Sequence, residues 1–195
     1  MMINKFKAIY FDLDGTLVDS GLNFSNMKRD LGFPEDCNIL EYIETLEDKL
    51  EYKRACQIIH EHEQTGAENS TLLPGVNELL KYIHDAKIPT GIITRNSCEV
   101  AKLTLDMHKL NFEHIITRDN FAAKPAPDSL NYLCELHKIN PKSALYIGDY
   151  LYDIQTAKNA NVQAGLYLND ANHDLRPEAD IIIDCYHSFL TSIQG

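Results

Sequence analysis

The chain has few basic residues, and it has no long apolar run. Lys and Arg number 18 against 29 Asp and Glu, which gives a formal net charge of −11. That balance argues against nucleic-acid binding, because a protein that binds phosphate backbones needs a basic surface. The apolar runs fall far short of the ~18 residues that a membrane span requires. We therefore expect neither a nucleic-acid partner nor a membrane span.

The five cysteines are odd in number and widely scattered, and no two of them have CxxC spacing. Such a set favours free thiols in a reducing compartment over a disulfide framework. The first candidate functional motif begins at Asp12, which leaves no room before it for a cleavable secretory signal. We therefore expect a cytoplasmic protein.

Short apolar runs rich in β-branched residues recur along the chain, and helical patterns lie between them. Uninterrupted runs of this length are typical of strands that are buried on both faces of a sheet. The alternation predicts an α/β fold built on a doubly wound parallel sheet of the Rossmann type. The predicted strands are 7–13, 89–94, 114–117, 144–148, 162–167 and 180–184, and the predicted helices between and after them are 74–86, 97–108, 127–137, 151–159 and 186–193.

One segment, residues 19–72, interrupts this alternation. It contains no convincing strand and predicts helices near 23–31, 38–46 and 47–64, with a polar exit at 65–70. We expect a small all-helical cap, inserted after the first strand and lying over the mouth of the sheet. The α/β core domain would then consist of residues 1–18 and 73–195, and the cap of residues 19–72.

Most of the acidic excess lies in this insertion. Residues 35–68 hold ten acidic residues against three basic ones. A charge run of this kind is typical of a solvated helix face, which is the interpretation we favour. The alternative is a patch that selects a cationic substrate group or a partner.

Polar side chains gather where the predicted strands end. Asp12 and Asp14 follow the first strand, and because they are two residues apart on an extended chain they project to the same side. Two carboxylates this close repel unless a cation binds between them or their protonation states differ. In a doubly wound sheet, ligands bind beyond the carboxyl ends of the strands, near a topological switch point. The other candidates are Thr94 after the second strand, Lys124 between the third and fourth, and Asp149 and Asp153 after the fourth.

This set of groups suits phosphoryl transfer. Such a site must neutralise phosphoryl oxygens, align an attacking oxygen and protonate the leaving one. A carboxylate nucleophile divides the reaction into two easier steps, and a second acid can donate and later withdraw a proton. Mg²⁺ prefers one or two carboxylates together with water and phosphate oxygens. A lysine, a hydroxyl and backbone N–H groups complete a cradle for the anion.

At this point the chain resembles a known family, the haloacid dehalogenase-like (HAD) hydrolases, and most closely their phosphatase branch, which includes phosphoglycolate phosphatase. The resemblance spans residues 7 to about 167, and it is most specific in DLDGTLVDS, which begins at Asp12, and in KPAPD, which begins at Lys124. It implies an HAD-type core, a Mg²⁺ cofactor and a small phosphorylated metabolite as substrate.

The resemblance also implies roles for individual residues. Asp12 would be the nucleophile that forms an aspartyl-phosphate, and Asp14 the general acid and base. Thr94 would bind the transferring phosphate, and Lys124 would bridge phosphate and nucleophile. The implied metal ligands are the Asp12 carboxylate, the Asp14 main-chain carbonyl and Asp149, with Asp153 as a further ligand or as an anchor for the ligands.

Two features depart from the family pattern. Arg95 directly follows Thr94, where many relatives have Asn, so it is a candidate for binding a phosphate or a substrate carboxylate. The alternative for Arg95 is a structural ion pair or solvent exposure. The insertion, at 54 residues, is shorter than the fuller caps of this branch. The pocket is then either more open, or completed by a partner subunit.

The acid at position 14 favours a leaving group that departs through oxygen, because the dehalogenases and phosphonatases of the family lack it. Our first hypothesis is therefore a Mg²⁺-dependent phosphatase acting on a phosphoglycolate-like compound or a sugar phosphate. A phosphomutase of the β-phosphoglucomutase type shares every core residue named here. A remote alternative is a non-catalytic phosphate-binding module that keeps the fold.

Overall fold

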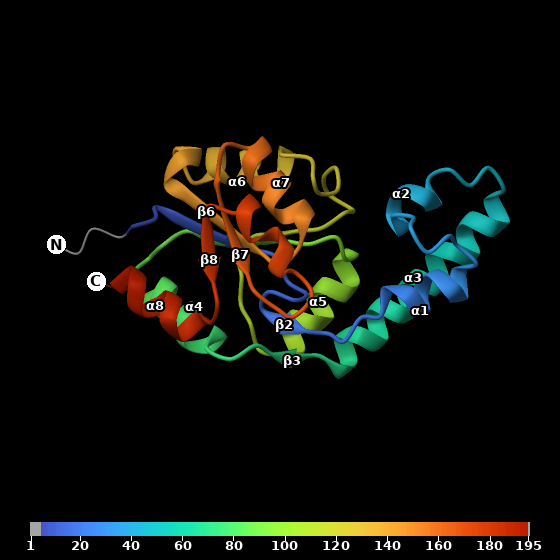
Figure 1. The fold of residues 1–195 in the computed structure, drawn as a ribbon, viewed down its shortest axis with the longest axis horizontal. Helices are drawn as coiled ribbons and strands as arrows, with labels where there is room; N and C mark the ends of the chain where they lie inside the picture. Colours follow the sequence, from blue (N-terminus) through green and yellow to red (C-terminus); the bar gives the residue numbers. More distant parts are fainter. Residues whose placement is uncertain (1–4, 195) are drawn as a thin grey trace.

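The centre of the protein is a six-stranded parallel sheet, seen in a computed structural model that describes residues 5–194 (Figure 1). The strand order is β5-β4-β1-β6-β7-β8, and every neighbouring pair is parallel. These strands are β1 (Ala8–Phe11), β4 (Thr90–Ile93), β5 (Ile115–Ile116), β6 (Ala144–Gly148), β7 (Gln163–Tyr167) and β8 (Ile181–Ile183). The predicted doubly wound α/β fold is confirmed.

Helices cover both faces of this sheet, because the strand side chains alternate between two apolar layers. Ile9 and Phe11 of β1 belong to one buried cluster, whereas Ala8 and Tyr10 belong to the other. The helices of the core are α4 (Val76–Asp85), α5 (Cys98–Met107), α6 (Asp128–Leu136), α7 (Leu151–Asn159) and α8 (Tyr186–Gln194), with 3-10 turns at Pro141–Ser143 and His173–Glu178. Across the described residues, no helix combines the length and apolar composition needed to cross a bilayer.

The insertion leaves and rejoins the core through a small hairpin. Strand β2 (Val18–Asp19) pairs antiparallel with β3 (Thr71–Leu72), so that Asp19 lies opposite Thr71. The prediction of no strand in residues 19–72 is wrong at both ends of the segment. A two-residue strand is too short to produce an alternating pattern, because it places one side chain on each face.

Three helices lie between the two strands of the hairpin, and they extend to one side of the core (Figure 1). They are α1 (Phe24–Leu31), α2 (Ile39–Ile43) and α3 (Lys49–Asn69), and α3 packs against α5 of the core. The division into a cap of residues 19–72 and a core of residues 1–18 and 73–195 stays a prediction. Residues 1–4 and 195 of that predicted core lie outside the described part of the chain.

Helix α3 continues through the segment that the sequence analysis took for a polar exit. Gly66 suggested a break there, but it is buried inside the helix. A Cβ atom at Gly66 would lie 3.0 Å from the Leu22 side chain, so glycine permits close packing of the helix at this position. This residue therefore serves helix packing rather than a turn.

The predicted solvated character of the acidic stretch holds for nine of its ten acidic residues, which are exposed. Glu63 is the exception, because it is buried on the side of α3 that faces the core. Its two carboxylate oxygens accept hydrogen bonds from Arg118, at 2.5 and 3.0 Å. Burial raises the pKa of Glu63, and Arg118 opposes that rise. This ion pair joins the insertion to the core.

Candidate active site

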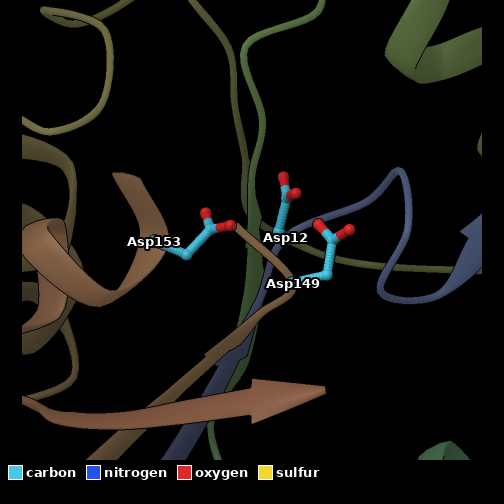
Figure 2. A group of neighbouring side chains, drawn as sticks. All are labelled: Asp12, Asp149 and Asp153. Carbon is cyan, nitrogen blue, oxygen red and sulfur yellow. The ribbon is translucent and has the colours of Figure 1, made fainter. Parts of the chain in front are cut away.

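The candidate site lies at the carboxyl end of β1. This strand is flanked by β4 and β6, and the strand order reverses between β1 and β6. Asp12 follows β1 directly, whereas Asp149 and Asp153 come from the loop after β6 and from the first turn of α7. One carboxylate oxygen from each of the three lies within 4.8 Å of the others (Figure 2). The structure thus brings together three of the predicted site residues.

Lys124 lies between two of these carboxylates. Its Nζ atom is 2.7 Å from Asp12 Oδ1 and 2.6 Å from Asp153 Oδ1, and its side chain is only 5% exposed. Burial by itself would lower the pKa of this ammonium, but the charges of Asp12 and Asp153 outweigh burial and raise it. Lys124 therefore carries a fixed positive charge beside the end of β1.

Asp153 is held by several donors at once. Its Oδ1 atom accepts hydrogen bonds from Lys124 and from the Tyr146 hydroxyl at 3.0 Å, and its Oδ2 atom accepts one from the Tyr150 backbone N–H at 3.0 Å. A Cβ atom at Gly148 would lie 2.2 Å from the Asp153 side chain, so only glycine fits there. With both oxygens engaged, Asp153 is better suited to anchoring Lys124 than to direct metal ligation.

Two asparagines position Asp149. Asn169 Nδ2 donates to Asp149 Oδ2 at 3.1 Å, and Asn172 Nδ2 donates to the Asp149 main-chain oxygen at 2.7 Å. Neither asparagine is among the site residues predicted from the sequence. They follow β7, which ends at Tyr167, so the rule that sites form at strand ends could have found them.

Asp14 lies in the loop between β1 and β2, two residues after Asp12. Its Oδ2 atom accepts a hydrogen bond of 2.6 Å from Asn96 Nδ2, a contact that the sequence analysis did not predict. Burial raises the pKa of Asp14, while hydrogen bonds from Ser20 and Asn96 partly offset that rise. A carboxyl group with a raised pKa keeps a proton closer to neutral pH, as a general acid must.

Thr94 and Arg95 follow β4, the other neighbour of β1. Thr94 is buried, and its hydroxyl oxygen accepts a hydrogen bond of 3.1 Å from the Asn96 N–H, which shapes the turn. Arg95 donates from Nη2 to Asn38 Oδ1 at 2.9 Å, and its guanidinium lies 4.9 Å from the centre of the Tyr152 ring. Within residues 5–194, no carboxylate forms an ion pair with Arg95, which disfavours the structural ion pair considered for it.

The comparisons with known proteins agree with this geometry. The family model described as haloacid dehalogenase-like hydrolase matches residues 9–166, which span most of the chain and all of the candidate site residues. The chain belongs to the haloacid dehalogenase-like hydrolase family.

Several relatives of this hydrolase are named as phosphatases. A phosphoglycolate phosphatase of Vibrio vulnificus is 30% identical over 82% of this chain and 82% of its own length. A haloacid dehalogenase-like hydrolase domain-containing protein of Arabidopsis thaliana is 29% identical over 76% of this chain and 65% of its own. A structure titled as a predicted phosphoglycolate phosphatase from Haemophilus somnus has a TM-score of 0.77 at 22% identity, covering 98% of this chain and 100% of the other. The relatives thus include phosphoglycolate phosphatases, and the solved structure shares the fold of this chain.

The donor set of this haloacid dehalogenase-like hydrolase fits Mg²⁺, because hard carboxylate and carbonyl oxygens are the ligands that ion prefers. A Cβ atom at Gly15 would lie 2.3 Å from Asp149 Oδ2, and the φ angle of Gly15 is +74°. Only glycine allows the backbone after Asp14 to approach Asp149 this closely. The Asp14 carbonyl, Asp12 and Asp149 therefore fit the ligand roles that the family resemblance implies.

Without metal, the crowded carboxylates of this hydrolase should make its stability fall as pH rises. Burial, followed by the charge of Asp153, raises the pKa of Asp149 to about 7 from its ordinary value of 3.8. Between these values the folded state binds more protons than the unfolded state, so the free energy of unfolding decreases with pH. Asp149 alone contributes at most about 4 kcal/mol over that window.

Chemical denaturation in EDTA at pH 5.5, 6.5 and 7.5 measures the slope of the free energy of unfolding against pH. Saturating Mg²⁺ should largely remove it, because the ion holds the carboxylates of the folded state ionised, as they are in the unfolded state. The matched variant Asp149→Asn should have a shallower slope in EDTA, because it lacks the contribution of Asp149. An equal slope in the variant would show that Asp149 is not its source.

Proposed function

We propose that this chain is a Mg²⁺-dependent phosphatase that hydrolyses a small phosphorylated metabolite through an aspartyl-phosphate on Asp12. The observation that carries the proposal is the buried contact of 2.7 Å between Asp12 and Lys124, within the cluster that also contains Asp149 and Asp153. A nucleophilic carboxylate beside a fixed ammonium suits an anionic substrate, because the positive charge offsets the repulsion between carboxylate and phosphoryl oxygens.

Lys124 serves two purposes in this mechanism. By engaging one oxygen of Asp12, it orients the other toward the phosphorus, and its charge lies where phosphoryl charge gathers. Thr94 and the backbone N–H groups after it would bind the remaining phosphoryl oxygens at the end of β4. Bound Mg²⁺ would neutralise charge on the phosphoryl oxygens.

Asp14 would act as the proton carrier. Its raised pKa favours the protonated form at the start, from which it gives a proton to the leaving oxygen as the Asp12–phosphate bond forms. As a carboxylate it then takes a proton from the water that hydrolyses the aspartyl-phosphate. The hydrogen bond from Asn96 fixes the orientation of its carboxyl group.

The substrate class is supported by the names of the relatives. Phosphoglycolate phosphatases recur among them, and a pyrophosphatase of Oceanobacillus iheyensis is 27% identical over 96% of both chains. We therefore propose a phosphoglycolate-like acid or a sugar phosphate as substrate, and we place the enzyme in the cytoplasm on the pattern of its cysteines. The phosphomutase alternative uses the same residues. It would be favoured if a sugar phosphate isomerised faster than the phosphoenzyme hydrolysed.

A panel of phosphorylated metabolites, assayed for phosphate release with Mg²⁺ and with excess EDTA, tests the proposal. At least one small phosphate ester should be hydrolysed, and EDTA should lower that rate by about 100-fold or more. Acid quenching of a reaction with a ³²P-labelled substrate should trap label on the protein. Hydrolysis that is unaffected by EDTA, or an absence of hydrolysis across the panel, would contradict a Mg²⁺-dependent phosphatase.

A further inference from the structure

Three side chains meet where the insertion touches the core, and we call Asn38, Arg95 and Tyr152 the seam cluster. Arg95 donates from Nη2 to Asn38 Oδ1 at 2.9 Å, and its guanidinium lies 4.9 Å from the centre of the Tyr152 ring. Asn38 Nδ2 donates to the Tyr152 hydroxyl at 2.7 Å. Each member thus contacts the other two, although they come from the insertion, from the loop after β4 and from α7.

The seam cluster spans the end of β1. Arg95 follows β4 and Tyr152 lies in the first turn of α7, which follows β6. These two strands are the neighbours of β1 on either side. A contact between the residues that follow them therefore bridges the strand end that carries Asp12. Asn38 adds contacts from the insertion to both of these residues.

Asn38 makes the contacts of this cluster instead of capping a helix. It occupies the N-cap position of α2, where asparagine side chains usually accept a hydrogen bond from a backbone N–H. Its side chain makes no such bond in this structure. Instead, its oxygen accepts from Arg95, and its amide group donates to Tyr152 and to Glu41. The Asn38 side chain therefore orients Arg95 instead of capping α2.

The guanidinium of Arg95 is only partly used. Its Nε atom is buried and has no hydrogen-bond partner among residues 5–194, and no carboxylate in that range pairs with its charge. A guanidinium edge formed by Nε and Nη2 matches the two oxygens of a carboxylate or a phosphate. A buried donor without a partner, on a cation that follows the strand next to β1, is suited to an anionic ligand.

We propose that Arg95 selects substrates whose leaving group carries an acidic oxyanion, a carboxylate or a second phosphate. The inference rests on the proposed phosphatase function, because the leaving group is defined by transfer of the phosphoryl group to Asp12. The acidic group would bind the Nε–Nη2 edge and take the place of Asn38 at Nη2. Arg95 would then contribute to substrate choice, whereas Thr94 and Lys124 bind the phosphoryl group common to every substrate.

Phosphonates that cannot be hydrolysed separate this inference from the proposed reaction. Isothermal titration calorimetry with Mg²⁺ would compare 3-phosphonopropionate, which ends in a carboxylate, with propylphosphonate, which ends in a methyl group, and with 1,3-propanebisphosphonate. The wild-type protein should bind at least one of the two acidic ligands about 10- to 100-fold more tightly than propylphosphonate. Whichever acidic ligand shows the larger preference identifies the oxyanion.

The variant Arg95→Gln should reduce that preference to less than about threefold, and Arg95→Lys should keep part of it, because lysine retains the charge without the planar edge. Arg29→Gln, on an exposed part of α1 where the side chain is 67% exposed, is the matched control and should keep the full preference. The inference is overturned if the wild type shows no preference or binds none of the ligands, or if Arg95→Gln weakens all of them equally. Hydrolysis in the metabolite panel reports separately on the phosphatase function.

Discussion

Replacing Asp12 with Asn is expected to abolish hydrolysis of phosphate esters, lowering kcat by about 10⁴- to 10⁶-fold. The amide is a poor nucleophile and cannot form the aspartyl-phosphate through which the proposed reaction proceeds. Folding should survive the change, because the amide has the size of the carboxyl group and Lys124 keeps its buried contact with Asp153 at 2.6 Å. Phosphate release by purified Asp12→Asn, measured beside its thermal unfolding midpoint, checks both expectations.

The matched control for this variant is Asp36→Asn, which removes an exposed carboxylate from the insertion. Its activity and its unfolding midpoint should both equal those of the wild type. If Asp12→Asn kept more than about a tenth of the wild-type rate, Asp12 would not be the nucleophile. A large loss of stability in Asp12→Asn would instead attribute its inactivity to unfolding.

Replacing Lys124 with Met should lower both the free energy of unfolding and the activity, and the loss of stability should be large. The ammonium lies between two carboxylates, and its removal leaves Asp12 and Asp153 buried and unneutralised. Removing one partner of a buried ion pair costs about 3–5 kcal/mol. Urea denaturation in EDTA at pH 7.5 should give a free energy of unfolding that is lower than that of the wild type by this amount.

The loss of unfolding free energy in Lys124→Met should become smaller as pH falls. Burial raises the pKa of Asp12 and Lys124 opposes that rise, so without Lys124 more of the folded variant carries a neutral Asp12 at pH 5. Lys158→Met is the matched control, because Lys158 pairs with Glu178 at 2.7 Å while both side chains are about half exposed. Its cost should be below about 1 kcal/mol at both pH values. A deficit in Lys124→Met that is constant with pH would contradict the electrostatic explanation.

The sheet and its helices could be predicted from the sequence because each element carries a local signal. The residues 144–148 and 151–159 were predicted with the bounds that the structure has for β6 and α7. Buried parallel strands produce continuous apolar runs, and amphipathic helices produce apolar residues at a spacing of three to four. The hairpin β2–β3 was missed because four residues carry no such period.

For the candidate site, the sequence predicted the charged residues but not the groups that hold them. Asp12, Lys124, Asp149 and Asp153 were all named in advance, and the structure brings them together. Asn96, Asn169 and Tyr146 were missed, because nothing in the segment around each of them identifies the carboxylate that it contacts. Glu63 was expected in solvent for the same reason, since its partner Arg118 lies 55 residues away. The catalytic roles given to the site residues stay predictions.

The hairpin β2–β3 has a consequence for how freely the insertion can be exchanged. Its two strands bring Asp19 and Thr71 side by side, about 5 Å apart, so a tight turn could join the core directly. Substituting one module for another at this point would leave the six-stranded sheet uninterrupted. The contact of Glu63 with Arg118 sets a condition on such a graft, because Arg118 also donates to the Arg95 main-chain oxygen at 2.6 Å. A transplanted module must supply a carboxylate there, or the turn after β4 loses a support.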